Sequence, residues 1–240
     1  MKRTDFTLKP SLIAMLAAAT LLTACGDDDD DDTVVVTPPA PVMQTFTVTV
    51  TNLTANQPMS PVILASHASD AMLWNAGEMA SEALEKMAEA GDTADIAALS
   101  VIESSVNGTG LLMPGMSETL TLTLDEAAVA SISLATMLVN TNDAFTGINN
   151  YTIAGMEVDA TTAMKFMAYD AGTEANSEAK GTMPGPADGG EGFNASRDDV
   201  DFVHIHPGVI SMYDGLADSV LGASHRFDNP VLAVTIMRTE

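Results

Sequence analysis

Alternating apolar and polar residues recur along the chain and predict β-strands. Residues 46–51 (FTVTVT) and 119–124 (TLTLTL) keep a strict period of two and are rich in branched side chains, a pattern typical of strands with one buried face. Residues 132–139 (ISLATMLV) are apolar almost without interruption, which predicts a strand buried on both faces. Three further apolar segments are also predicted to be strands: 163–169, 201–206 and 231–238.

One segment has helical character instead. Residues 78–90 (EMASEALEKMAEA) consist of good helix formers, and Gly91 is suited to end the helix. A second short helix is predicted over 94–103. The apolar positions of the first helix follow a spacing of three and four residues, and they are predicted to face the core: Met79, Ala83, Met87 and Ala90.

Many strands with one helical interruption predict an all-β fold. We expect an antiparallel β-sandwich of about eight strands with one or two inserted short helices. The folded domain is expected to span residues 44–240, an ordinary length for a single domain. Segments rich in glycine, asparagine, proline and aspartate separate the strands, above all 171–199, and are expected to form loops.

The N-terminal segment departs from this pattern. Three basic residues come first, followed by an apolar run at 12–22 and then Thr23, Ala24 and the only cysteine, Cys25. The run is too short to span a bilayer as a mature helix, and the segment resembles a bacterial lipoprotein signal peptide. We therefore expect cleavage of residues 1–24 and a covalent lipid on Cys25 that attaches the protein to the membrane. The alternative is an ordinary secretory signal with an incidental cysteine.

An acidic and proline-rich segment follows the cysteine. Six consecutive aspartates occupy 27–32, and prolines follow between 38 and 41. Like charges repel each other and prolines stiffen the chain, so residues 25–43 are predicted to form the acylated cysteine and a solvated tether. Gly26 stands where an aspartate commonly retains such lipoproteins in the inner membrane. We expect a lipid-anchored protein of the bacterial cell envelope, at the outer membrane, on a side that the sequence leaves open.

The chain is strongly acidic, with a formal net charge of −24. Residues 1–24 carry three basic and one acidic side chain, so their removal would change the charge to −26. Such a surface repels phosphates, which excludes nucleic acid as a partner. It attracts divalent cations, which bind to carboxylate oxygens, although acidic residues also simply keep proteins soluble.

Three stretches of the chain together resemble the spondin N-terminal domain family, which is known from F-spondin and mindin in animals and from many bacterial lipoproteins. The matching residues are Trp74, Gly77, Ala80 and Ser81 in the first stretch, 142–145 and Gly147 in the second, and 170–174 in the third. Ala144-Phe145 replaces the family's tryptophan after the aspartate. The stretch 204–208 (HIHPG) is not an animal feature, but the bacterial branch carries a similar one.

The resemblance implies an antiparallel β-sandwich with a bound calcium ion. In the family the ion is held by the aspartate of the second stretch, by the first aspartate of the third, and by an acidic residue before the central strand. These ligands correspond to Asp143, to Asp170, and to Glu126 or Asp125, with Glu174 as a further candidate. Asp143 and Asp170 each follow a predicted strand, so adjacent strands can bring them together at one end of a sandwich.

His204 and His206 form a second candidate site. Residues two apart in a strand face the same side, so both imidazoles are placed to bind one zinc ion. The further ligands would come from the other histidines and from nearby aspartates, namely His67, His225, Asp198, Asp199 and Asp201. The pattern alone favours a structural interpretation, in which the two histidines lie on a strand surface or support a loop.

The motifs favour a binding module over an enzyme. The chain has no nucleophile elbow and no phosphate-binding loop. The resemblance favours a lipid-anchored, calcium-binding module for adhesion or interaction at the cell envelope, with an unidentified protein or glycan as its partner. The alternatives are a zinc-dependent hydrolase centred on His204 and His206, and a purely structural envelope lipoprotein.

Overall fold

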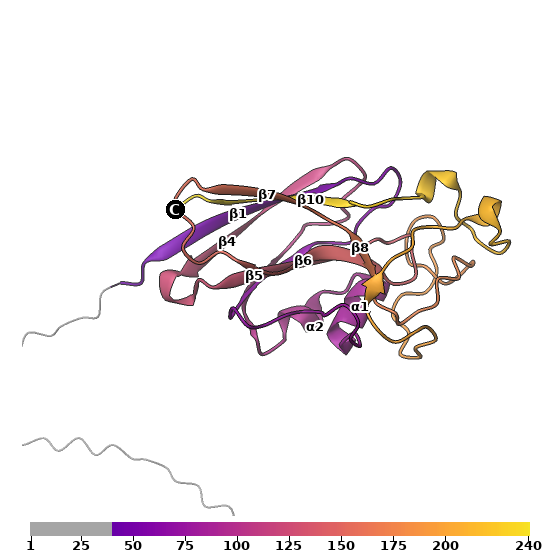
Figure 1. The fold of residues 1–240 in the computed structure, drawn as a ribbon, viewed down its shortest axis with the longest axis horizontal. Helices are drawn as coiled ribbons and strands as arrows, with labels where there is room; N and C mark the ends of the chain where they lie inside the picture. The colour runs from indigo at the N-terminus through magenta and orange to yellow at the C-terminus, as the bar shows by residue number, and fades with distance from the viewer. Residues whose placement is uncertain (1–39) are drawn as a thin grey trace, which may run out of the picture. The chain divides into compact units, whose positions relative to one another are not determined.

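Two antiparallel sheets that face each other make up the frame of the protein (Figure 1). The computed structural model describes residues 40–240, so the predicted signal peptide, Cys25 and most of the tether lie outside the described residues. The four-stranded sheet has the order β4 (Ser117–Asp125), β1 (Met43–Asn52), β10 (Leu232–Arg238) and β7 (Thr161–Phe166). The six-stranded sheet has the order β3 (Ile102–Asn107), β2 (Ile63–His67), β5 (Ser131–Met137), β6 (Ala144–Thr152), β8 (Ala168–Asp170) and β9 (His204–Ile205). The predicted all-β sandwich is confirmed.

The alternating segments form the strands that the sequence predicts. In β1, Phe46, Val48 and Val50 are fully buried between the sheets, whereas the threonines face outward. On that outer face Thr49 lies 2.8 Å from Thr119 of β4, hydroxyl to hydroxyl. Burial of one face of the strand, together with cross-strand pairs on the other, holds the four-stranded sheet in register.

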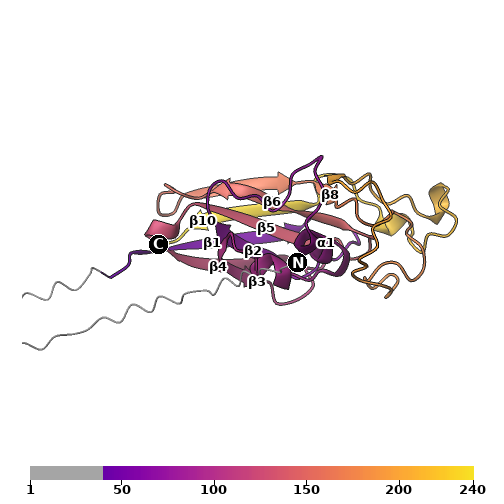
Figure 2. The ribbon, with the colours of Figure 1, turned by 90° about the horizontal axis from the view of Figure 1, so that it is seen from below.

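Strand β5 is buried along its whole length, as its unbroken apolar sequence predicts. Ile132 and Leu134 pack between the two sheets, whereas Ala135 and Met137 belong to a second apolar cluster on the outer face of the six-stranded sheet. Helix α1 (Glu82–Ala90) covers that outer face (Figure 2). The six-stranded sheet is therefore the middle layer of three.

The helical segment is shorter than predicted. Helix α1 begins at Glu82 because the Ser81 hydroxyl caps it, accepting the Leu84 N–H. Met79 therefore lies before the helix and is 65% exposed, so its predicted place in the core is wrong. Gly91 ends α1 in a left-handed conformation, as predicted. The second helix, α2 (Ala94–Ala97), is a single turn, and β3 begins soon after it.

Two predicted strands differ in the structure, one being divided and the other shortened. The segment 163–169 forms β7 in one sheet and β8 in the other, because the chain crosses between the sheets at Met167. The segment 201–206 contributes only β9, since Asp201 adopts a positive φ of 61° that an extended strand does not allow. Both departures depend on tertiary contacts rather than on the local apolar pattern.

Long loops between residues 171 and 231 gather at one end of the sandwich (Figures 1 and 2). Three single-turn 3-10 helices complete the elements: η1 (Glu126–Ala128), η2 (Met212–Asp214) and η3 (Ala223–His225). Over residues 40–240, the helices are too short to cross a bilayer.

Candidate metal centre

Two paired strands carry acidic residues to the loop-rich end of the sandwich. Asp143 directly precedes β6, and Asp170 is the last residue of β8. The strands pair antiparallel with Ala144 opposite Asp170, and the Ala171 N–H donates to the Asp143 carbonyl. The pairing therefore brings the backbone at Asp143 next to the backbone at Asp170, and the Asp170 carboxylate is close enough to raise the pKa of Asp143.

The Asp143 carboxylate is fully buried, and only one of its two oxygen atoms accepts hydrogen bonds. Its Oδ2 accepts the Thr173 and Glu174 backbone N–H groups, at 2.8 and 3.1 Å, and the Thr173 hydroxyl at 3.2 Å. Its Oδ1 is buried and has no hydrogen-bond partner among the described residues. Burial, together with the Asp170 carboxylate, raises the pKa of Asp143 to about 8. A buried oxygen of this kind is suited to a proton or a cation.

The Asp170 carboxylate is also fully buried. Its Oδ1 accepts the Gly172 N–H at 2.8 Å, and its Oδ2 accepts the Asn176 side-chain amide at 2.6 Å. The short loop after β8 thus folds back onto the aspartate that precedes it. These donors fix the direction in which the carboxylate presents its remaining lone pairs.

Gly172 makes this loop possible. Its φ is +71°, and a Cβ at this position would lie 2.3 Å from the Phe202 carbonyl oxygen. The close approach lets the Asp201 N–H donate to the Gly172 carbonyl at 2.7 Å. Only glycine combines this conformation with this proximity, so the residue joins the loop after β8 to the segment before β9.

Glu174 extends the acidic cluster toward α1. Its side chain is largely buried, and burial followed by the Glu89 and Asp143 carboxylates raises its pKa to about 8. Glu89 is fully buried on α1, where its Oε2 accepts the Asn194 N–H at 2.8 Å and its Oε1 has no hydrogen-bond partner among residues 40–240. Burial raises the pKa of Glu89 as well.

Positive charge is scarce around these carboxylates. Within the described part of the chain, no lysine or arginine forms an ion pair with Asp143, Asp170 or Glu174. Arg197 pairs instead with Glu85 and Asp201, at 2.6 Å each. When these carboxylates are ionised, the protein's own basic side chains therefore do not compensate their charge.

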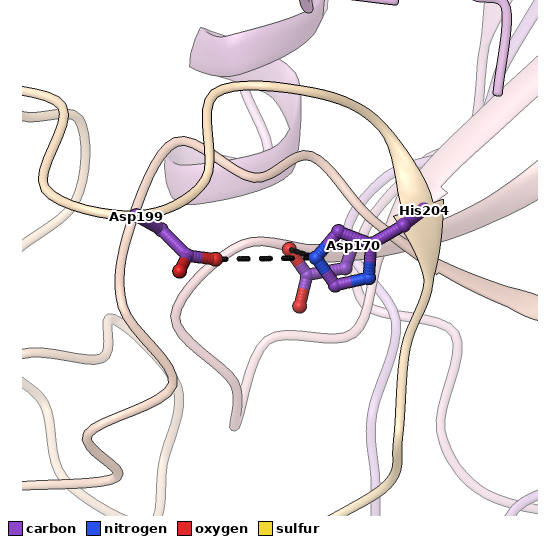
Figure 3. Close-up of side chains that lie close together, drawn as sticks. All are labelled: Asp170, Asp199 and His204. Carbon is purple, nitrogen blue, oxygen red and sulfur yellow. Dashed lines mark ion pairs between the residues drawn. The ribbon is translucent and has the colours of Figure 1, made fainter. Parts of the chain in front are cut away.

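A histidine and a third aspartate lie close to Asp170 (Figure 3). The His204 Nε2 lies 3.3 Å from Asp170 Oδ1 and 4.0 Å from Asp199 Oδ2. One ligand atom from each of the three residues lies within 4.8 Å of the others. Burial, followed by the Asp170 carboxylate, raises the pKa of Asp199. Such a set of nitrogen and oxygen atoms has the chemistry of a metal site.

His206 approaches the same aspartate but has no free ring nitrogen. Its Nε2 lies 3.9 Å from Asp170 Oδ2 and donates to the Asn176 side-chain oxygen, while its Nδ1 accepts the Gly208 N–H. Burial lowers the pKa of His206 to about 4, so the ring is neutral. The prediction that His204 and His206 are joint ligands is therefore corrected for His206, which supports Asn176 instead.

A comparison with known protein families identifies the family of this chain. A family model, Spondin_N, matches residues 49–183. The chain belongs to the Spondin_N family. The comparison with curated protein sequences gives no match.

The three stretches on which the spondin resemblance depends converge on this site. Trp74 packs edge-to-face on Phe145, which stacks on Tyr169, with ring centroids 5.2 and 5.6 Å apart. The Gly77 N–H donates to the Val203 carbonyl at 2.7 Å, next to His204. The aromatic cluster thus supports the strand ends that carry Asp143 and Asp170 in this Spondin_N domain.

Two predicted calcium ligands lie elsewhere. Asp125 caps η1 by accepting the Ala127 N–H at 2.9 Å, and Glu126 accepts the Gln44 side-chain amide at 3.3 Å. Both residues precede β5, whereas Asp143 follows it, so the length of this strand, roughly 20 Å, separates them. The structure does not bring Asp125 or Glu126 to the cluster, because both residues lie at the start of β5 and the cluster lies beyond its end.

Sequence reasoning missed two members of the site and singled out a third only among several. Glu89 and Asn176 were not predicted, and Asp199 was one of five possible partners of His204. The spacing of Glu85 and Glu89, four residues apart beside apolar Leu84 and Ala88, placed two charges on the buried face of a helix. No signal marked Asn176, whose role depends on the path of its loop.

Proposed function

We propose that this chain is a spondin-family interaction module of the cell envelope whose loop-rich end binds a calcium ion. The observation that carries the proposal is the group of buried carboxylates formed by Asp143, Asp170 and Glu174. All three lie inside the segment that matches the family model. The proposed module is held at the membrane by a lipid on Cys25.

The oxygen donors of these residues are of the type that calcium prefers. Binding would require Asp143, Asp170 and Glu174 to move closer together, because among the described residues only Asp170, Asp199 and His204 have ligand atoms within 4.8 Å of one another. Calcium prefers six to eight oxygen ligands, drawn from carboxylates, carbonyls and water. Asp143 offers a buried oxygen without a hydrogen-bond partner in the described structure, and Glu174 is largely buried beside it. Asp170 would present the lone pairs that its amide donors leave free. Burial, followed by repulsion among these side chains, raises the pKa values of Asp143 and Glu174 to about 8, and a bound dication would stabilise their ionised forms.

Thermal unfolding tests the calcium proposal. The melting temperature of the full chain is expected to rise when calcium replaces EDTA, because an ion that binds only the folded state stabilises it. Asp143→Asn should abolish this rise while leaving the protein in EDTA at pH 8 no less stable, since it removes an uncompensated buried charge. Asp125→Asn is the matched control and should respond to calcium as the wild type does. An unchanged response in Asp143→Asn would contradict the proposal.

The lipid anchor is proposed from the N-terminal sequence alone. Basic residues, a short apolar run and a cysteine after small residues are the signals that support it. Mass spectrometry of protein from the membrane fraction tests it. The expected mass is that of a chain beginning at an acylated Cys25, and a chain that retains residues 1–24 or begins without a lipid would contradict it.

The partner is proposed to be a protein or a glycan at the cell envelope. The charge of −24 argues against nucleic acids and other polyanions. A pull-down from envelope and culture material, with calcium and with EDTA, would identify the partner. Recovery that depends on calcium and is lost in Asp143→Asn would connect the partner to the carboxylate cluster. If the same partner is recovered equally with calcium and with EDTA, partner binding does not depend on the ion.

A further inference from the structure

His204 and Asp199 lie outside the segment that the Spondin_N model matches, yet they converge on Asp170. His204 Nε2 is 3.3 Å from the nearer Asp170 oxygen and 4.0 Å from Asp199. Around a tetrahedral ion with bonds of about 2.0–2.2 Å, ligand atoms lie about 3.3–3.6 Å apart. The first distance already fits this spacing, and the second requires only a small shift of the partly exposed Asp199 side chain.

The His204 ring has the orientation of a metal-binding imidazole. Its Nδ1 lies 3.1 Å from the Ile205 carbonyl oxygen, to which it donates its proton. The lone pair is then on Nε2, which is the atom that faces the two carboxylates. Metal-binding histidines commonly donate their other ring N–H to a backbone carbonyl or a carboxylate, which fixes the ring and its tautomer.

The Asp170 carboxylate is also held in place by surrounding residues. The His206 Nε2–H donates to Asn176, and the Asn176 amide donates to Asp170 Oδ2 at 2.6 Å. His206 is in turn fixed by the Gly208 N–H and by the Phe227 ring, whose centroid is 5.4 Å away. These hydrogen bonds fix the orientation of the Asp170 carboxylate, so the buried His206 acts as a positioning residue.

The cluster is open to solvent on one side. The side chains of His204 and Asp199 are 29% and 21% exposed, whereas Asp170 is fully buried. An ion can therefore enter from the surface and meet the buried carboxylate at the bottom of the site. Three protein ligands would leave at least one coordination position for water or for an oxygen atom of a partner.

We propose that Asp170, Asp199 and His204 bind a divalent transition metal ion such as zinc, at a site separate from the calcium ligands Asp143 and Glu174. The set of one imidazole and two carboxylates suits zinc and its neighbours better than calcium, which prefers oxygen ligands. The zinc site goes beyond the proposed calcium function and shares only Asp170 with it.

Calorimetric titration of the EDTA-stripped full chain with zinc chloride tests the proposal, with cobalt(II) absorption as a second measurement. We expect one zinc ion per chain and a cobalt band in the visible range. His204→Gln and Asp199→Asn should each weaken zinc binding at least tenfold. Both side chains are partly exposed, so these variants are expected to fold. His225→Gln is the matched control and should bind zinc as the wild type does.

Variants distinguish the calcium proposal from the zinc proposal. Asp143→Asn should lose the calcium response and keep zinc, His204→Gln should do the reverse, and Asp170→Asn should lose both. Absence of zinc binding, or wild-type affinity in His204→Gln, would overturn the zinc site. If the protein shows no calcium response but binds zinc through His204, the zinc proposal is supported and the calcium proposal is contradicted.

Discussion

Asp143, Glu174 and His206 of the candidate metal centre couple folding to pH in directions set by their pKa shifts. The pKa values of Asp143 and Glu174 rise to about 8 from ordinary values of 3.8 and 4.5. Over that interval the folded chain holds protons that the unfolded chain has released, so stability falls as the pH rises. His206 acts oppositely between its folded pKa of about 4 and its ordinary 6.5. Above pH 6.5 only the carboxylates contribute.

The melting temperature in EDTA is therefore expected to fall between pH 6.5 and 8. Asp143→Asn should make this slope shallower, because one of the carboxylates with a raised pKa is removed. Calcium should oppose the fall, since a cation stabilises the ionised carboxylates. Scanning calorimetry in EDTA across this interval is the measurement. A melting temperature that rises over the same interval would show that the carboxylates already have compensated charges.

Gly172 provides a second test at the scale of one residue. Gly172→Ala is expected to cost about 2 kcal/mol or more, because the new Cβ meets the Phe202 carbonyl at 2.3 Å and φ stays positive. Gly155 has a φ of +77°, but a Cβ added there would have no atom within 4 Å, so Gly155→Ala should cost only about 1 kcal/mol. Urea unfolding compares the two. Equal losses would mean that the contact with Phe202 does not constrain the loop.

Single residues were predictable where a motif marked them. Asp143 and Asp170 were found because each follows an apolar strand, and the strands β6 and β8 beside them pair. Asp125 and Glu126 were misplaced because the resemblance fixes them only relative to β5, whose two ends lie far apart. Asn176 depends on loop geometry, which neither periodicity nor composition encodes.

At the scale of elements, the segment 193–203 is held on α1 by a partly buried ion pair. Arg197 donates to Glu85 at 2.6 Å and to the Ala80 carbonyl, while its other nitrogen pairs with Asp201. The Glu85 side chain is only 5% exposed. Because this segment carries Asp199, the ion pair also positions one of the proposed zinc ligands.

Arg197→Met is expected to destabilise the protein by about 3 kcal/mol, because Glu85 would remain buried without its partner. Adding Glu85→Gln to Arg197→Met should recover much of the lost stability, because it removes the unpaired buried charge. Arg226 pairs with Asp214 at the surface, so Arg226→Met should cost less than about 1 kcal/mol. Denaturant unfolding of the four proteins is the measurement. Similar costs for Arg197→Met and Arg226→Met would contradict this role of the pair.

Elements were predicted well where periodicity was strong. The alternation in β1 and β4 and the apolar run in β5 each gave the correct type and exposure. The continuous run 163–169 gave no sign that the chain changes sheets, because both halves are apolar enough for a strand. Helix α1 was predicted too long, since propensity alone did not weigh the capping hydroxyl of Ser81.

At the scale of the whole molecule, the candidate metal centre and the start of β1 lie at opposite ends of the sandwich. Met43 pairs with Asp125 at the end where β5 begins, whereas Asp143 follows the end of β5. The overall fold could be predicted because the apolar pattern and the family motifs agreed. The loops around the centre could not, because their order comes from side-chain contacts such as those of Asn176 and Arg197.

Cys25→Ser tests the attachment of the whole molecule. The variant is expected to move from the membrane fraction to the soluble fraction, because the proposed acyl chains on Cys25 would supply the membrane affinity. Ala24→Ser leaves the cysteine in place and serves as a control that should remain membrane-bound. Immunoblotting of fractionated cells is the measurement. A membrane-bound Cys25→Ser protein would show that something other than the lipid holds it.

The central claim is that Asp143, Asp170 and Glu174 hold a calcium ion. Calorimetric titration of calcium into the EDTA-stripped full chain, alongside Asp143→Asn, tests it most directly. We expect one calcium ion per chain for the wild type and at least a tenfold loss of affinity in the variant. Absence of heat from the wild type, or equal affinity in the two proteins, would contradict it.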